Sequence, residues 1–333
     1  MTISFNEMRV HKRLLKQRSL VITAIFIGFL MACLVIKYHT GNMDSGGFKF
    51  ALEQYFPDDI SCYYEEDIED DYWLHYIDKF KSTDVYFHWT SCRYTIKLAH
   101  LCAIEAASRA YPSDKVYVLF CKPLQFSILQ KKLLNIFLEY MKSVKFVRIS
   151  VTNYFNETPF IKTVGGFLNS RLLKKHKRLE EALKLTTLYR NGGIVVDTNV
   201  IVTEIPDIPK HWLVQEKSRS LSSAMLSFKT DKVILIEDGM MLLEDKYQNY
   251  SLSSFLTDQY NLCLGDGDCQ DIVLLDKEIV NVEYTDKATK IPPAFAYRVV
   301  DKVFERRFPN NSLLGVIAKK YCPFVYSKSY LFK

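Results

Sequence analysis

A pair of glycines between two apolar segments constrains this chain more than any other feature. Apolar side chains in Leu179–Arg190 recur near helical spacing, and Asn191-Gly192-Gly193 follows at once. Glycine takes the left-handed conformation that a helix C-cap needs, so the helix is expected to stop here. Ile194–Val196 is an apolar, β-branched run, which favours a strand buried on both faces. The stretch therefore predicts a helix, a tight turn and a buried strand.

A polar tripeptide, Asp197-Thr198-Asn199, ends this strand, and the apolar run resumes at Val200–Val202. Ligands of α/β proteins bind at the carboxyl ends of the sheet strands. The tripeptide is therefore the first candidate for a binding site.

Strands and helices alternate along the chain before this stretch. Strands are predicted at Asp84–Trp89, Lys115–Cys121 and Val144–Ser150, and helices at Lys97–Tyr111 and 124–141. This alternation predicts an α/β fold, with a parallel sheet, right-handed crossovers and helices on both faces.

The N-terminal region contains an uncharged apolar segment, Leu20–Ile36, whose 17 residues would span roughly 26 Å as a helix. Basic residues precede it, and only Lys37 follows immediately, so the positive-inside rule predicts a type II anchor. A cleaved signal peptide is the alternative, but the apolar core is long and lacks a small-x-small cleavage site. We expect a cytosolic tail (1–19), a transmembrane helix (20–36), a lumenal stem (37–83) and a lumenal domain (84–333).

The formal net charge of +6 does not indicate a nucleic-acid-binding protein. Basic residues gather near the N-terminus and around Lys174–Arg178, and no basic-aromatic motif accompanies them. We therefore expect no nucleic-acid partner.

Seven of the eight cysteines lie beyond the apolar segment, where an oxidising lumen would favour disulfides or buried thiols. Cys263 and Cys269 flank a turn-rich loop that a local bridge could close, and Cys92 with Cys102 is a second candidate pair. Seven is an odd number, so at least one thiol is free or intermolecular. Sequons that agree with a lumenal location begin at Asn156, Asn249 and Asn310.

The central stretch resembles a known family. Leu188–Asn199 reads LYRNGGIVVDTN, which is similar to the helix-GGIY-x-D-x-D signature of the Golgi α-1,4-glycosyltransferases, the family of lactosylceramide 4-α-galactosyltransferase. Thr90-Ser91 after the first strand, the helix around Cys102–Arg109, and the Tyr-Cys-Pro at 321–323 resemble further parts of the family pattern.

The resemblance implies a glycosyltransferase-A fold, preceded by the single transmembrane helix, in the Golgi membrane. It implies retaining α-1,4 transfer of galactose or N-acetylgalactosamine from UDP-galactose or UDP-N-acetylgalactosamine to a glycolipid, in glycosphingolipid biosynthesis. By the same resemblance, a divalent cation such as Mn²⁺ is bound by Asp197 and Asn199. The positions that correspond to the family's nucleotide-sugar site are Thr90, Ser91, Lys184, Gly192, Gly193, Asp197 and Thr198.

The chain departs from the family in the same motif. Asn199 stands where the family has a second carboxylate, and its neutral carbonyl oxygen coordinates metal more weakly. Lys184 replaces an arginine and loses the bidentate fork that suits phosphates. The alternative interpretation is therefore a catalytically impaired protein of the same fold that binds or scaffolds in the Golgi, and a third is a purely structural membrane glycoprotein.

The charge asymmetry around Leu20–Ile36 predicts that residues beyond about Tyr38 lie in the lumen. Protease treatment of sealed microsomes should leave this part intact, with glycans that endoglycosidase removes. Protection of the first ten residues in place of the remainder would contradict the topology and the disulfide argument that depends on it.

Overall fold

The computed structural model describes residues 80–90, 96–121, 128–155, 158–159, 176–204, 211–216, 220–229, 233–242, 251–266, 271–275, 279–283, 287, 291–300, 308 and 311–329. The chain divides into two compact units, Met1–Pro57 and Asp58–Lys333, and every described residue lies in the second. The apolar segment 20–36, Ser91, Cys92, Cys269 and the three sequon asparagines lie outside the described residues. No helix in the described part is long and apolar enough to cross a membrane.

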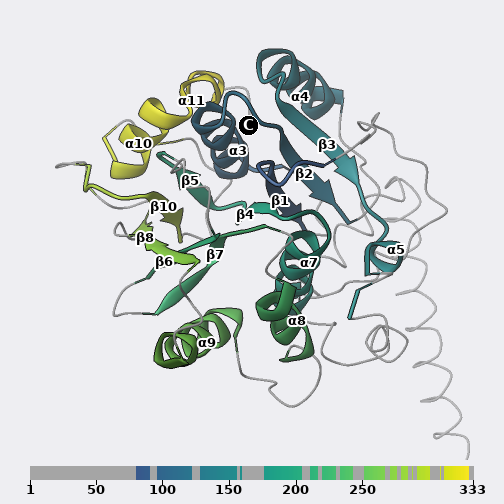
Figure 1. Ribbon diagram of the computed structural model, residues 1–333. Coiled ribbons are helices and arrows are strands. Elements are labelled where there is room, and N and C mark those ends of the chain that lie inside the picture. The colour runs from purple at the N-terminus through teal and green to yellow at the C-terminus, as the bar shows by residue number, and fades with distance from the viewer. Residues whose placement is uncertain are drawn as a thin grey trace, which may run out of the picture. The chain divides into compact units, whose positions relative to one another are not determined.

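The core of the second unit is a seven-stranded sheet in the order β3-β2-β1-β4-β7-β6-β8 (Figure 1). Neighbours among β1 to β4 run parallel, β7 is antiparallel to both β4 and β6, and β8 is parallel to β6. The prediction of an α/β fold with a parallel sheet is confirmed for this half. The strands are β1 (Val85–Trp89), β2 (Val116–Phe120), β3 (Val144–Arg148), β4 (Gly193–Val196), β6 (His211–Gln215), β7 (Leu221–Phe228) and β8 (Ile272–Leu275).

Helices cover both faces of the sheet, as the alternation predicts (Figure 1). Alternate side chains of β4 enter different cores, because Ile194 and Val196 pack on one side and Val195 on the other. The first core contains residues of α3 (Leu98–Ala110), α4 (Ile128–Tyr140), α10 (Leu313–Tyr321) and α11 (Pro323–Lys328). The second contains residues of α5 (Val151–Phe155), α7 (His176–Asn191), α8 (Val233–Leu242) and α9 (Leu252–Asp266).

A smaller sheet has the order β5-β10-β9, with β5 at Val200–Val202, β10 at Ala296–Val299 and β9 at Ile279–Val282. The apolar run that resumes after Asn199 is therefore a strand of a different sheet. The backbone N–H of Val200 donates to the carbonyl of Asp197 (3.0 Å) and closes a turn. The polar tripeptide thus occupies the crossing between the two sheets.

Gly192 and Gly193 have φ angles of 64° and 98°, in the left-handed region where a Cβ is costly. The N–H of Gly192 donates to the carbonyl of Leu188 (2.9 Å) and ends α7 as expected. At Gly193, an added Cβ would lie 2.6 Å from the carbonyl oxygen of Asp84. The second glycine is therefore required by the close approach of the chain to the start of β1.

The C-terminal helices are fixed to α3 by a disulfide between Cys102 and Cys322, 220 residues apart in the sequence. The predicted Cys92–Cys102 pair is therefore wrong, because local spacing carries no information on so distant a partner. Glu105, on the same helix, accepts hydrogen bonds from the backbone N–H groups of Phe324 (2.9 Å) and Val325 (2.7 Å) at the start of α11. Cys121 is a free, buried thiol, as an odd cysteine count allows.

Gly193→Ala should lower the free energy of unfolding by about 3 kcal/mol, since the new Cβ meets backbone at a positive φ. Gly265→Ala is the matched control, because a Cβ there meets nothing within 4 Å, and in α9 it should leave stability unchanged or raise it by about 0.5 kcal/mol. Urea unfolding of the two variants measures both. Equal stability of the two would contradict the packing at Gly193.

Candidate functional site

The candidate site lies at the carboxyl edge shared by β1 and β4. The two strands are parallel, with Phe87 opposite Val196, so Thr90 and Asp197 leave the sheet at the same edge. Gly192 precedes β4 and Gly193 is its first residue, so both glycines lie at the other end of the strand. The structure therefore brings Thr90 together with the tripeptide, and it separates both from the glycines, whose role is to shape the turn.

The tripeptide is held rigidly by backbone contacts on both sides. The N–H of Asp197 donates to the carbonyl of Ala224 on β7 (2.8 Å). The N–H of Val299 on β10 donates to the carbonyl of Asn199 (2.9 Å), and the Nδ2 of Asn199 donates to the carbonyl of Val299 (3.2 Å). All three side chains stay partly exposed, so they remain available to a ligand.

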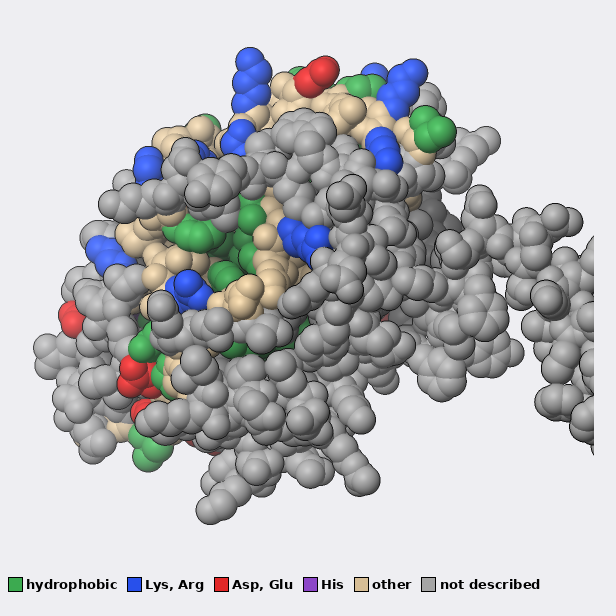
Figure 2. Space-filling view, turned by 90° about the vertical axis from the view of Figure 1, so that its right-hand side faces the viewer, with side chains coloured by type: hydrophobic (Ala, Val, Ile, Leu, Met, Phe, Trp, Pro, Cys, Tyr) green, Lys and Arg blue, Asp and Glu red, His purple; other side chains and the backbone are tan. Residues whose placement is uncertain are grey.

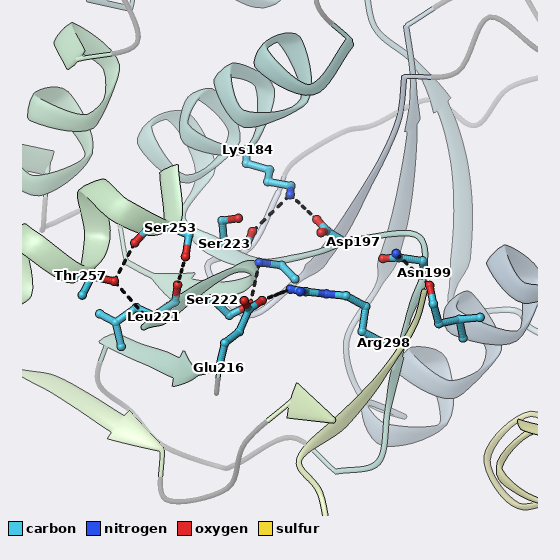
Figure 3. Close-up of polar contacts among 12 residues, drawn as sticks. Lys184, Asp197, Asn199, Glu216, Leu221, Ser222, Ser223, Ser253, Thr257 and Arg298 are labelled. Carbon is cyan, nitrogen blue, oxygen red and sulfur yellow. Dashed lines mark hydrogen bonds and ion pairs between the residues drawn. The ribbon is translucent and has the colours of Figure 1, made fainter. Parts of the chain in front are cut away.

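Lys184 reaches the tripeptide from α7 (Figure 3). Its Nζ forms an ion pair with the Oδ1 of Asp197. The same Nζ lies 3.3 Å from the Oε1 of Glu180, one helical turn earlier, and donates to the carbonyl of Ser223 on β7 (3.2 Å). The lysine side chain is only 4% exposed. The predicted site residues Lys184 and Asp197 are therefore in direct contact, and Glu180, which the sequence reasoning missed, belongs with them.

Burial controls the electrostatics of this pair. Removal from water raises the pKa of Asp197 to about 7, although Lys184 favours the carboxylate. Burial disfavours the ammonium as well, but attraction to Asp197 and Glu180 outweighs that cost and raises the pKa of Lys184 above its ordinary value. Lys184 therefore keeps its positive charge at every physiological pH.

The donor set does not fit Mn²⁺ in the way that the family resemblance implies. Asp197 already contacts an ammonium, and Asn199 directs its amide nitrogen at a backbone carbonyl. Two unit charges of one sign, 4 Å apart, repel by about 4 kcal/mol at an effective dielectric constant of about 20, and a dication beside Lys184 roughly doubles that. Among the described residues, no group of three or more His, Cys, Asp or Glu side chains could hold a metal ion.

A second basic residue, Arg298, lies at this edge because β10 pairs with β5 and sets it opposite Val200. Its Nη2 donates to the Oγ of Ser222 (2.9 Å) and forms an ion pair with Glu216 (Figure 3). Arg298 also favours the ionised form of Asp197. The sequence reasoning missed it as a site residue, because strand pairing across about a hundred residues has no local signal.

One face of the protein is visibly hollowed (Figure 2). Hydrophobic side chains line the hollow, Lys or Arg side chains flank it, and no described Asp or Glu side chain is visible inside it.

A buried hydrogen-bond network holds α7 against the sheet below the site. Thr187 donates to the carbonyl of Leu183 (2.9 Å), so its single hydrogen is used. Its oxygen must therefore accept from the Nε2 of His88 (2.7 Å) and the hydroxyl of Tyr154 (2.8 Å). Burial lowers the pKa of His88 to about 3, and the neutral ring with hydrogen on Nε2 satisfies this arrangement.

No protein-family model matches the chain, and no curated protein matches its sequence. Several solved glycosyltransferase structures are similar in three dimensions. Galactosyltransferase LgtC in complex with donor and acceptor sugar analogs has a TM-score of 0.41 and 12% identity, covering 74% of this chain and 96% of that chain. PaToxG glycosyltransferase has a TM-score of 0.40 and 13% identity, covering 58% and 72%.

Glycosyltransferase GlyE of Streptococcus pneumoniae TIGR4 has a TM-score of 0.37 and 10% identity, covering 74% of this chain and 63% of that chain. With TM-scores below 0.5 and identities below 25%, these similarities do not by themselves establish a shared fold or activity.

Thr187→Val should lower the free energy of unfolding by about 2–3 kcal/mol, because it leaves His88 and Tyr154 without their buried partner. The neighbouring Thr186→Val is a matched control. The Thr186 hydroxyl is buried without a hydrogen-bond partner, so its loss should leave stability unchanged or raise it by about 1 kcal/mol. Urea unfolding compares the two, and equal losses would refute the network.

Proposed function

We propose that this chain is a glycosyltransferase that takes its sugar from a nucleotide donor. The observation that carries the proposal is the partly exposed Asp197 carboxylate at the carboxyl edge of β1 and β4, held in place by buried Lys184. Ligands of α/β sheets bind at this edge, and a carboxylate oxygen accepts hydrogen bonds from sugar or ribose hydroxyls. The helix-GGI-strand-DTN pattern at 179–199 supports the same activity.

Two basic side chains at the site suit the departure of a nucleoside diphosphate. Breaking the bond between sugar and phosphate leaves negative charge on the diphosphate, and fixed cations stabilise that charge. Lys184 and Arg298 are the cations of the described residues at this edge, each oriented by a carboxylate. We infer that the positive charges of these two side chains stabilise the leaving diphosphate when the donor is cleaved.

The finer assignment rests on the family resemblance. We propose a glycosyltransferase-A domain and a UDP-galactose or UDP-N-acetylgalactosamine donor, with retaining α-1,4 transfer to a glycolipid. We further propose a type II anchor at 20–36 in the Golgi membrane, which would hold the domain beside lipid-bound acceptors. Mn²⁺ is not part of this assignment, because the donor set at Asp197 and Asn199 fits it poorly.

A second candidate function is binding without turnover. Its supporting observation is that both residues at the motif's carboxylate positions have partners within the protein, Asp197 with Lys184 and Asn199 with Val299. Such a protein would bind the nucleotide or the acceptor and release no sugar.

Asp197→Ala should reduce the rate of sugar hydrolysis or transfer from UDP-galactose and UDP-N-acetylgalactosamine at least a hundredfold. The change removes the carboxylate at the site, and it leaves Lys184 as a buried charge without its principal partner. Glu139→Gln is the control, since this exposed residue lies on α4 away from the site. Release of UDP measures turnover. An unchanged rate of UDP release in Asp197→Ala would contradict the assignment of the site. UDP binding by the wild type without any turnover would favour the second function.

A further inference from the structure

The environment of the Lys184 ammonium is that of a bound cation. Three oxygens from three elements surround its Nζ: the Oε1 of Glu180 on α7, the Oδ1 of Asp197 after β4, and the carbonyl of Ser223 on β7. An ammonium group has three N–H donors, so each of them has a partner. The residue is 3% exposed, and these three oxygens form a cage around its ammonium group.

The same oxygens are the kind that a hard divalent cation prefers. Two carboxylates and a backbone carbonyl suit Mn²⁺ or Mg²⁺. Lysine and metal therefore compete for one place, and the lysine is tethered there by its own helix. With both carboxylates ionised, the cluster of Lys184, Glu180 and Asp197 has a formal charge of −1 while the ammonium is in place. Without the ammonium the charge would be −2, with both carboxylates facing the vacated place.

We propose that Lys184 occupies the place of a divalent cation between Glu180 and Asp197, so that no metal is held there and the site binds its nucleoside diphosphate without one. The inference rests on the proposed function, and it adds which cation that site uses. The same inference explains why the site functions with Asn199 at the position where the family has a second carboxylate. A carboxylate at 199 would have little to coordinate, whereas the amide ties the tripeptide to β10 through the carbonyl of Val299.

A latent metal site follows from the same geometry. Truncation of the lysine in Lys184→Ala empties the cage and leaves Glu180, Asp197 and the Ser223 carbonyl around the space. The variant should be destabilised, because two carboxylates lose their common partner. Added Mn²⁺ should then bind in the cage and recover stability.

The first test measures UDP binding to the full-length protein in detergent by calorimetry, once in EDTA and once in MnCl₂. The inference expects dissociation constants within about twofold of each other. Binding that is at least tenfold weaker in EDTA would overturn the inference and leave the proposed function standing. Absence of UDP binding in both solutions would overturn the proposed function, and the inference with it.

The second test measures thermal unfolding with and without MnCl₂. Mn²⁺ should raise the Tm of Lys184→Ala by about 4 °C or more and leave that of the wild type unchanged. Lys184→Arg keeps the positive charge and should not respond. Arg109→Ala is the matched control, because it also removes the cation from a buried carboxylate, Glu105, yet creates no cage. An equal Mn²⁺ response in wild type and Lys184→Ala would refute the proposal, and if Lys184→Ala does not fold, the UDP measurement on the wild type decides.

Discussion

The arrangement of the site depends on one buried cation. The ammonium of Lys184 joins α7 to the exit of β4 and to β7 through oxygens of Glu180, Asp197 and Ser223. Loss of one partner from a buried ion pair typically costs about 3–5 kcal/mol, because the other charge stays buried alone. The contact therefore fixes the Asp197 carboxylate in addition to the backbone hydrogen bonds of the surrounding turn. It also makes the site a poor host for a second cation.

Much of the fold could be predicted from the sequence, because its signals are local. Runs rich in apolar and aromatic residues predicted β1, β2, β3 and β4 close to their observed bounds, and the glycines at 192 and 193 marked the end of α7. The polar tripeptide was correctly placed at a strand end, although nothing in the run at Val200–Val202 indicated a change of sheet. Periodicity reports which face of an element is buried, and it does not report the sheet to which a strand belongs.

The parts of the site that could not be predicted depend on distant contacts. Lys184 looked like a phosphate ligand by its position in the motif, whereas its charge is directed at two carboxylates of the protein. Arg298 reaches the site only because β10 pairs with β5. The partner of Cys102 lies 220 residues away, and no spacing rule would have selected Cys322. Each of these contacts is set by tertiary packing, which a single sequence does not encode in any short window.

One structure determination tests most directly the proposal of a sugar-transfer site whose cation is part of the chain. Crystals grown with UDP and MnCl₂, measured at the manganese absorption edge, would show both the nucleotide and any bound metal. The account predicts UDP at the carboxyl edge of β1 and β4, the Nζ of Lys184 in contact with Asp197, and no anomalous peak between Asp197 and Asn199. A manganese peak coordinated by these two side chains, with Lys184 displaced, would contradict it.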